Sequence, residues 1–220
     1  MRYAFNFRDI WAQWPSIAEG IGVTLMLTAV TMVAGLVIGA LGAAGRVYGR
    51  SWLRTPLAAY VEVVRNTPLL VQLFIIFFGL PSLGVRLDAV AAALIALSVN
   101  LGAYTTEIIR AGLEAVPRSQ IEAGYSLGLS GTQVFRHVVL APAIRIVYPA
   151  LTSQFVLMML ATSIVSQISA PDLFHIASII QSRTFRDFEI YAVIAMVYLA
   201  LALILKLLFA ATAQIAFARR

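Results

Sequence analysis

Five long stretches with almost no charged residue constrain this chain more than any other feature. Four of them contain no Asp, Glu, Lys or Arg and cover residues 20–45, 66–85, 89–106 and 146–171. The fifth begins at Ile190 and runs to residue 218, with Lys206 as its single charge. A bilayer core needs about 20 apolar residues in a helix, whereas the strands of a membrane barrel are short and alternate. The pattern predicts an all-α integral membrane protein with five transmembrane helices.

The composition supports this class. Only 12% of the 220 residues are charged, 61% are hydrophobic and the mean hydropathy is +0.90, whereas soluble domains carry about 25% charged residues. The net charge is +6, but the basic residues flank the apolar segments, so they indicate topology and no nucleic-acid partner. With no cysteine and only His137 and His175 as imidazoles, we expect no metal site.

The basic residues also predict the orientation. Five spans place the termini on opposite sides of the membrane. Ten basic residues fall on one side: Arg46, Arg50, Arg54, Arg110, Arg118, Arg136, Arg145, Lys206, Arg219 and Arg220. Five fall on the other: Arg2, Arg8, Arg86, Arg183 and Arg186. By the positive-inside rule the larger group is cytoplasmic, so we expect the N-terminus outside and the C-terminus in the cytoplasm.

The chain divides into a short N-terminal segment and one membrane domain. Residues 1–16 predict an interfacial amphipathic helix, because Phe7, Ile10, Trp11 and Trp14 recur at helical spacing, with Pro15 closing the segment. Residues 17–220 form a single transmembrane domain. Its expected spans are 20–45, 56–80, 89–109, 146–169 and 190–212, and its cytoplasmic loop is 111–143. Gly35 and Gly39 in the first span predict close helix packing.

Polar residues within the spans are candidates for a solute pathway, because each is costly in lipid. Asn66, Thr67 and Pro68 should break the second helix, since proline removes a backbone donor and crowds the preceding turn. Broken helices at membrane depth expose amide groups that can hold a carboxylate. Ser and Thr in spans more often bond to their own helix. The candidate pathway residues are Asn66, Thr67, Pro68, Gln72, Asn100, Ser153, Gln154, Thr162 and Ser163.

Two pairs of opposite charges lie toward the cytoplasmic ends of the second and third spans. Glu62 and Arg65 are three residues apart, as are Glu107 and Arg110. This spacing brings the two side chains to one helix face. We expect each pair to act as a structural ion pair or an inner gate rather than in solute contact.

The longest hydrophilic stretch contains a compact element at Ile121–Ala143, which reads IEAGYSLGLSGTQVFRHVVLAPA. Gly128 suits the left-handed residue that ends a helix, and Ser130 or Thr132 can cap a second short helix. Pro142 marks the start of the fourth span. A partly apolar knob on the cytoplasmic face is typical of a docking element.

This element resembles the EAA loop of the permease subunits of ABC importers. Further segments resemble the polar amino acid uptake branch, which includes permeases for histidine, glutamate, glutamine, arginine and opines. They are Arg65–Gln72, Tyr104–Arg110, Ala115–Pro117, Glu122–Ser130 and Thr184–Tyr191. The resemblance covers roughly residues 55–215 and implies the five-helix fold of a type I ABC importer permease in the bacterial inner membrane.

The resemblance also implies partners and a division of labour. This chain would be a non-catalytic transport subunit forming half of a pathway for an amino acid or related small polar solute. It lacks the glycine loop of ATPases, so it would hold no cofactor, while two partner ATPase subunits bind ATP and Mg. A second permease chain and a periplasmic or lipid-tethered binding protein complete the importer. The residues expected to couple to the ATPase are Glu122, Ala123, Gly124, Gly128, Val138 and Leu140.

The chain departs from the family pattern at several positions. Gly124 replaces the alanine that ends the EAA triplet, Pro142 comes one residue late, and Asn66 stands where many relatives have glycine. In the fourth span Leu160 and Ala161 replace a Lys-Asp pair. Two explanations stay open for this last change. Either a partner permease retains the charges, which favours a heterodimer over a homodimer, or the solute is less polar or differently charged, such as an opine or a compatible solute.

Two other classes compete with the importer. A secondary transporter or channel without ATP coupling would need acidic residues deep within its spans, and here the acids sit at the span ends. A structural scaffold would leave the docking loop and the broken helix unexplained.

Overall fold

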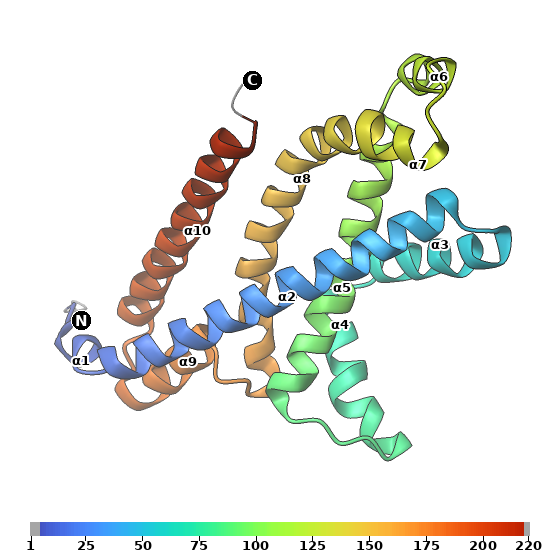
Figure 1. Cartoon of the computed structure of the whole chain (residues 1–220). Coiled ribbons are helices and arrows are strands. Elements are labelled where there is room, and N and C mark those ends of the chain that lie inside the picture. The colour runs from blue at the N-terminus through green and yellow to red at the C-terminus, as the bar shows by residue number, and fades with distance from the viewer. Residues whose placement is uncertain (1–4, 218–220) are drawn as a thin grey trace.

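The computed structural model describes residues 5–217, which are helical almost throughout (Figure 1). Arg2, Arg219 and Arg220 lie outside the described residues. The first helices are α1 (Arg8–Trp11), α2 (Trp14–Tyr48), α3 (Ser51–Arg65), α4 (Leu69–Phe74) and α5 (Ala89–Glu114). They are followed by α6 (Arg118–Ser126), α7 (Gly131–Val134), α8 (Leu140–Ala161), α9 (Leu173–Thr184) and α10 (Asp187–Phe217).

Short irregular helical turns extend two of these helices where a proline interferes. A π-helical turn, Ile75–Gly79, and a 3₁₀ turn, Leu80–Leu83, continue α4 through Pro81. A second π-helical turn, Phe135–Val139, joins α7 to α8 just before Pro142. A proline cannot donate the usual backbone hydrogen bond, and wider turns of this kind accommodate the loss. A 3₁₀ segment, Thr162–Ile168, ends α8.

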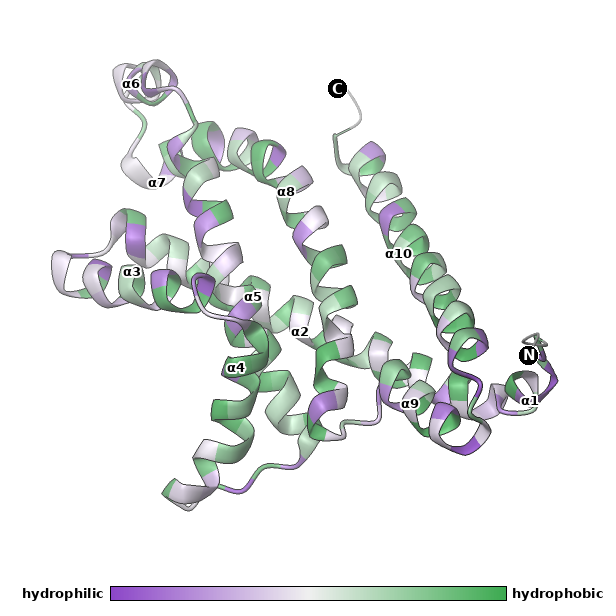
Figure 2. Ribbon diagram, turned by 180° about the vertical axis from the view of Figure 1, so that it is seen from behind, coloured by the Kyte–Doolittle hydropathy of each residue, from purple (hydrophilic) through white to green (hydrophobic). Residues whose placement is uncertain are grey.

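Four helical segments of the described chain are long and apolar enough to cross a membrane alone: α2, α5, Gly131–Ile168 and α10. The second expected span, 56–80, is a bent pair, in which α3 and Leu69–Leu83 meet at 108°. The count reaches five when this pair is taken as one crossing. Figure 2 shows that hydrophobic residues dominate these helices and that hydrophilic ones concentrate in α3, α6 and the connecting turns.

The long helix α2 crosses α5 at close range, which confirms the packing expected from the small residues of the first span. A Cβ atom added to Gly35 would lie 2.6 Å from Leu101, and one added to Gly39 would lie 2.3 Å from Thr105. Side chains at these positions would force the two helices apart. Glycine therefore sets the distance between them.

Two hydrophobic cores flank this crossing. The larger joins α2, α4, α5 and α8 through residues that include Leu27, Leu73, Leu97 and Phe155. The smaller joins the N-terminal segment to α9 and α10 through Ile10, Ile17, Leu173, Ile190 and Ile194. The molecule is thus held together mainly around α5, with a second contact region at the end of α2 near the N-terminus (Figure 1).

The N-terminal segment differs in detail from the expected single amphipathic helix. It forms the four-residue helix α1 and a turn, and the long helix α2 begins at Trp14. Pro15 does not close the segment but lies in the first turn of α2, where its missing N–H costs nothing. Ile10 is fully buried against the smaller core, while Trp11 and Trp14 remain exposed.

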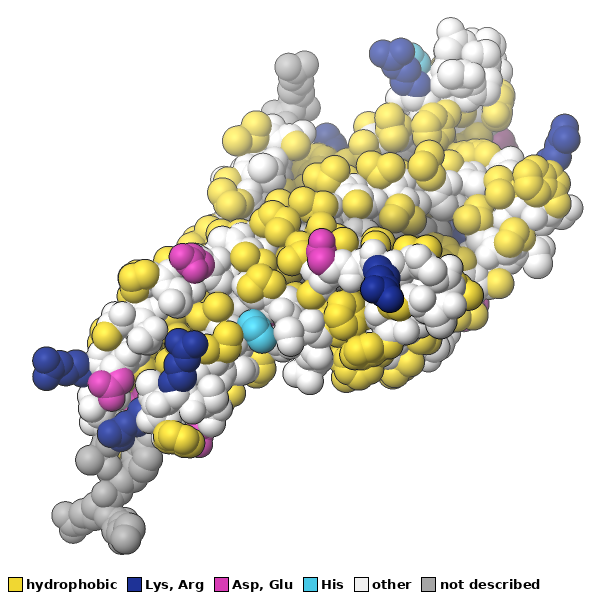
Figure 3. Space-filling model, turned by 90° about the horizontal axis from the view of Figure 1, so that it is seen from below, with side chains coloured by type: hydrophobic (Ala, Val, Ile, Leu, Met, Phe, Trp, Pro, Cys, Tyr) yellow, Lys and Arg dark blue, Asp and Glu magenta, His cyan; other side chains and the backbone are white. Residues whose placement is uncertain are grey.

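Helix α10 stands at the edge of the molecule (Figure 1). Only 11% of its most apolar stretch is buried, compared with 61% for α5. Seen from below, broad hydrophobic areas cover the surface and charged side chains are scattered between them (Figure 3). Such a surface suits lipid or further subunits rather than water.

Candidate functional site

The break between α3 and α4 is built by side chains that take over lost backbone bonds. The Asn66 side-chain amide donates to the carbonyl of Glu62 (2.8 Å), and the Thr67 hydroxyl donates to the carbonyl of Val63 (2.8 Å). Pro68 then adopts an extended conformation before α4 begins. The structure therefore confirms that Asn66, Thr67 and Pro68 interrupt the second apolar segment.

Gln72 and Asn100 lock this break against α5. The Gln72 amide nitrogen donates to the Val64 carbonyl (2.8 Å) and to the Thr67 hydroxyl (2.8 Å), bridging the two helices. The buried Asn100 donates to the Gln72 carbonyl oxygen (3.0 Å). Polar groups that the sequence suggested for solute contact are therefore engaged with each other. Their first effect is to fix the 108° bend.

A cavity of about 290 Å³ opens beside the break, between α4, α5 and α8. It brings together four of the candidate pathway residues: Thr67, Pro68, Asn100 and Gln154. Its apolar wall comes from the face of α8 that carries Leu157 and Ala161. Ala161, one of the two positions where a charged pair was expected, thus lies on the cavity wall.

A second cavity, of about 670 Å³, lies farther along α5 toward α6. Its polar groups are Arg65, Tyr104, Glu107 and Gln154, and its other lining residues include Ala111, Gly112, Ile146 and Ala150. Tyr104 and Gln154 line both cavities. These two residues, one from α5 and one from α8, mark the junction of the two cavities. Tyr104 was quoted as part of a family motif but was not proposed as a pathway residue.

Charged groups gather on one side of the second cavity. Glu107 accepts a hydrogen bond from Arg46 of α2 at 2.6 Å and also pairs with Arg110 of its own helix. Arg110 reaches Glu114 as well, at 2.5 Å. The expected pair between Glu107 and Arg110 is therefore formed. Arg46 adds a contact between helices that local spacing could not predict.

The other expected ion pair, Glu62 with Arg65, is not formed among the described residues. Arg65 instead places its guanidinium 5.3 Å from the centre of the Tyr104 ring, across to α5. The Glu62 carboxylate accepts a hydrogen bond from Asn66 at 3.1 Å. The end of α3 at the break gives each side chain a better partner than its neighbour three residues away, so the prediction of this pair was wrong.

The remaining candidates in the fourth span do not reach these cavities. Thr162 is buried and donates to the Met159 carbonyl (2.7 Å), and Ser163 donates to the Leu160 carbonyl (2.9 Å). Both hydroxyls therefore satisfy their own helix, as Ser and Thr commonly do in membrane spans. Ser153 lies in a separate groove between α8 and α10.

At the opposite end of the molecule from the smaller core, α6 and α7 form a projecting knob (Figure 1). Gly128 ends α6 with φ of +78°, a conformation that side chains disfavour. The backbone N–H of Ser130 donates to the Gln133 side chain (2.8 Å), which caps α7. Leu127 at the tip is 81% exposed, and Glu122 is also exposed. The turn and cap that the sequence predicted are confirmed.

The knob is joined firmly to the membrane helices. Val116, Val134, Val139 and Ala143 form a small buried core beneath it. Its second helix continues through the π-helical turn into α8, as one helical segment from Gly131 to Ile168. The knob and the α8 wall of the cavities therefore belong to one continuous helical segment.

Packing inside the knob explains one departure from the family pattern. A Cβ atom added to Gly124 would lie 3.2 Å from Val134 and 3.3 Å from Val138. An alanine at this position would require these two valine side chains to shift by a few tenths of an ångström, and glycine avoids that shift. Of the other candidate coupling residues, Ala123 is exposed on α6 and Leu140 is 37% exposed at the start of α8.

Comparisons with known proteins agree with this arrangement. The family model of the binding-protein-dependent transport system inner membrane component matches residues 32–215. The L-cystine transport system permease protein TcyB of Bacillus subtilis (strain 168) is 38% identical over 88% of this chain and 83% of its own length. The glutamine transport system permease protein GlnP of Escherichia coli (strain K12) is 34% identical over 92% of this chain and 93% of its own length.

A solved structure shares the whole fold. The crystal structure of an amino acid ABC transporter with histidines contains a chain that is 36% identical and superimposes with a TM-score of 0.90, covering 96% of this chain and 99% of that one. The secondary-transporter alternative finds no support in these comparisons. With its family model, its relatives and its fold in agreement, the chain belongs to the binding-protein-dependent transport system inner membrane components, the permease subunits of ABC importers.

Proposed function

We propose that this chain forms half of the translocation pathway for an amino acid or related small polar solute in the bacterial inner membrane. The observation that carries the proposal is the pair of cavities that meet at Tyr104 and Gln154. Together they run from the helix break to the charged residues near the knob. The N-terminus would face the outside and the knob the cytoplasm, as the distribution of basic residues indicates.

The chemistry of the cavities suits a solute that carries both charges. An amino acid presents a carboxylate and an ammonium group, and the larger cavity holds the Arg65 guanidinium and the Glu107 carboxylate. Arginine binds carboxylates with charge-assisted hydrogen bonds. In the smaller cavity Gln154 offers a neutral partner, and Thr67 and Asn100 line the same space beside it while they bond to the helix break. Glu62, Arg65, Glu107 and Arg110 would form the cytoplasmic gate of this route.

The relatives support the solute class and the assembly. The names of two relatives specify L-cystine and glutamine, and the similar solved structure is an amino acid transporter. We therefore propose that two ATPase subunits, a second permease and a substrate-binding protein complete the importer. Leu160 and Ala161 favour a partner permease of different sequence. Isolation of the tagged complex from its native membrane and identification of its subunits by mass spectrometry would distinguish a heterodimer from a homodimer.

Coupling to the ATPase would occur through the knob, at Glu122, Ala123, Gly124, Gly128, Val138 and Leu140. Its projecting tip and its continuous helical connection to α8 support this role. The matching groove on the ATPase is implied by the family.

The test compares two aspartate substitutions in the knob, measured in the purified complex with binding protein and a panel of amino acids. Leu127→Asp places a charge on the exposed apolar tip, while Gln120→Asp alters an exposed polar position of α6. We expect Leu127→Asp to reduce solute-stimulated ATP hydrolysis at least tenfold while the complex remains in the membrane, and Gln120→Asp to retain it. Normal stimulation in Leu127→Asp would contradict the coupling role. A panel in which no amino acid stimulates the unmodified complex would contradict the solute class.

A further inference from the structure

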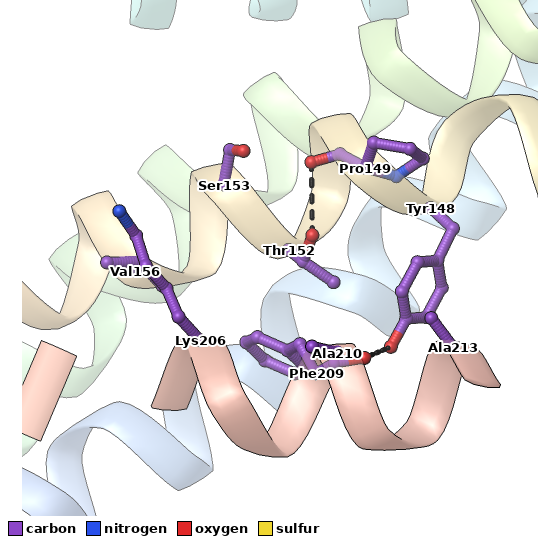
Figure 4. A pocket seen from close by; sticks show the side chains of 9 residues that line it. All are labelled: Tyr148, Pro149, Thr152, Ser153, Val156, Lys206, Phe209, Ala210 and Ala213. Atoms are coloured by element: carbon purple, nitrogen blue, oxygen red, sulfur yellow. Dashed lines mark hydrogen bonds between the residues drawn. The ribbon is translucent and has the colours of Figure 1, made fainter. Parts of the chain in front are cut away.

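Helix α10 borders two grooves that differ in character. The groove toward α8 includes polar side chains, among them Lys206 (Figure 4). The other groove, of about 480 Å³, lies between α10 and the N-terminal segment. Phe7, Trp11 and Trp14 form one of its walls, and the stretch 192–200 of α10 forms the other. All the side chains that line this second groove are hydrophobic, so its occupant must be apolar where it enters.

The second groove has the depth of one membrane leaflet. The apolar run of α10 begins at Ile190, and the groove extends along this helix from Ala192 to Ala200. At 1.5 Å per residue its inner end lies about 15 Å from Ile190. This distance is about half of the hydrocarbon core, which is about 30 Å thick. The groove therefore runs from one surface of the core to about its middle, in the leaflet that surrounds the N-terminal end.

Two tryptophans mark the outer rim of this groove as a membrane boundary. Helix α1 lies near the start of α10 (Figure 1), and Ile10 packs there against Ile190 in the smaller core. Trp11 and Trp14 remain 57% and 41% exposed, with their ring centres 5.6 Å apart. Tryptophan is enriched at the level of the lipid headgroups. The rim thus lies where a lipid would enter the groove from its own leaflet.

The groove is too narrow to take in a helix of a second permease. Its two walls meet along one side, where Ile10 and Ile17 pack with Ile190 and Ile194. A volume of about 480 Å³ over about 12 Å of helix gives a cross-section of about 40 Å². An α-helix with its side chains, about 10 Å or more in diameter, needs about twice this area. A single hydrocarbon chain is slender enough to lie in the groove.

Arg8 supplies a positive charge at the same rim. It follows Phe7 directly and comes three residues before Trp11 in α1, a spacing that places the two side chains on one helix face. Arg8 is exposed and forms no ion pair within the described residues. The neighbouring carboxylate of Asp9 accepts a hydrogen bond from the Asn6 side chain (3.5 Å). Arginine binds phosphate with paired, charge-assisted hydrogen bonds, so the rim suits a phosphate headgroup.

We infer that this groove binds one anionic phospholipid, with an acyl chain between the N-terminal segment and α10 and its phosphate at Arg8. The bound lipid fills the space between these two elements and holds the N-terminal segment against α10. The inference goes beyond the proposed function and does not depend on transport. Only the assignment to the outer leaflet uses the proposed orientation.

The test compares lipid crosslinks at two positions of α10 in the complete importer, reconstituted into vesicles of equal parts phosphatidylglycerol and phosphatidylcholine. The photo-crosslinking residue p-benzoylphenylalanine replaces either Met196, which lines the groove and is 65% exposed, or Leu199, which is 51% exposed and lies outside the lining. Mass spectrometry then gives the ratio of the two lipid adducts. We expect phosphatidylglycerol to be enriched about fivefold at position 196 over position 199, the effect of one arginine at a membrane surface. Arg8→Gln should remove this enrichment, and Arg8→Lys should keep it.

Three results would overturn the lipid site. Equal adduct ratios at the two positions would mean that the groove holds ordinary bilayer lipid. A crosslink from position 196 to another subunit would mean that a protein covers the groove. Arg183→Gln on α9, at another exposed arginine, controls for general surface charge, and loss of the enrichment in this variant as well as in Arg8→Gln would contradict a defined headgroup site. None of these results touches the proposed transport function, which the ATP hydrolysis assay tests separately.

Discussion

Helices α5 and α10 are both long and apolar, yet they are used in opposite ways. α10 is the more hydrophobic of the two, but only 11% of its most apolar stretch is buried, against 61% for α5. In water the more apolar helix would lie inside. In a membrane the surroundings are also apolar, so packing is decided by how closely backbones can approach. Hydrophobicity therefore indicates here what faces lipid or a second subunit, and small residues indicate what lies inside the chain.

The residues of the two helices show how this difference arises. α5 buries Ala92, Ala93, Ala96 and Gly102 together with Thr105. α10 instead exposes large side chains, such as Leu203, Leu207 and Met196. It is attached partly through two tyrosine hydroxyls, those of Tyr148 and Tyr198. Close packing should therefore govern the stability of α5 in the fold, and polar contacts should govern the attachment of α10.

The largest effect is expected at the crossing of α2 with α5. Gly39→Leu would place its Cβ atom 2.3 Å from Thr105, and neither helix backbone can yield without breaking other contacts. Overpacking of a core typically costs 1–3 kcal/mol and occasionally more, and we expect roughly 3 kcal/mol or more here because the obstacle includes backbone atoms. The variant should lose most of its yield in the membrane, as measured by immunoblot and by size-exclusion chromatography in detergent.

Gly22→Leu in the same helix is the matched control. A Cβ atom at Gly22 meets no atom within 4 Å, so this variant should accumulate like the unmodified protein. Equal yields of the two leucine variants would show that the close approach of α2 and α5 does not limit folding.

A smaller effect is expected at Asp172, which precedes α9 and links it to α10. The buried carboxylate accepts hydrogen bonds from the backbone N–H groups of Phe174 (3.2 Å) and His175 (2.9 Å), and from the Tyr198 hydroxyl (3.3 Å). Asp172→Ala removes the helix cap and leaves these donors unpaired, at a cost of about 2 kcal/mol. Thermal unfolding in detergent should show a lower midpoint, and retention of the original midpoint would mean that water replaces the carboxylate.

The same residue predicts a pH dependence. Burial raises the pKa of the Asp172 carboxyl above its ordinary value, although its hydrogen bonds oppose this shift. The folded state then keeps the proton to a higher pH than the unfolded state, so stability falls as the pH rises through the raised pKa. Asp172→Asn cannot titrate. As the pH rises from about 4 to about 7, the unfolding midpoint of the unmodified protein should fall relative to that of Asp172→Asn. A difference between the two midpoints that stays constant with pH would contradict the shifted pKa.

Much of the fold could be predicted from the sequence because membrane spans leave a strong local signal. The charge-free runs identified the apolar segments. The close crossing of α2 and α5 was predicted from Gly35 and Gly39, and the turn and cap of the knob were predicted from Gly128 and Ser130. The bend at Pro68 was predicted, but its angle was not, because it depends on Gln72 reaching Val64 and Asn100 reaching Gln72. These contacts join residues 8 and 28 positions apart in the chain, which is beyond the helical spacing that local patterns encode.

The site was predicted less completely for the same reason. The polar residues of the spans were identified, but Thr162 and Ser163 satisfy their own helix, and Arg65 prefers the Tyr104 ring to Glu62. Tyr104 was missed because a tyrosine in an apolar helix has many possible roles. Its position opposite the break could have been noticed, since it lies one helical turn beyond Asn100 on α5.

A modest effect is expected where α8 meets α10. The Tyr148 hydroxyl donates to the Phe209 carbonyl (2.7 Å) and contacts the Thr212 hydroxyl (2.5 Å). Tyr148→Phe keeps the ring and removes these bonds, which costs about 1 kcal/mol and should lower the unfolding midpoint by about 2–4 °C. Tyr191→Phe on α10 is the control, because Tyr191 contributes a stacked ring against Phe174. Equal effects of the two variants would mean that ring packing, not the hydroxyl, attaches α10.

The smallest effect separates two carboxylates of α5 that contact the same arginine. Glu107 and Glu114 both pair with Arg110, but Glu107 also holds Arg46 of α2, and its side chain is 24% exposed against 56% for Glu114. Exposed ion pairs within one helix contribute about 0.3–0.5 kcal/mol, so Glu114→Gln should shift the unfolding midpoint by no more than about 1–2 °C. Glu107→Gln leaves two arginines partly uncompensated beside the larger cavity. It should therefore lower the unfolding midpoint more than Glu114→Gln does. Equal unfolding midpoints for the two glutamine variants would show that only the glycines of α2 hold it to α5. The charges at the end of the crossing would then be free to serve as a gate.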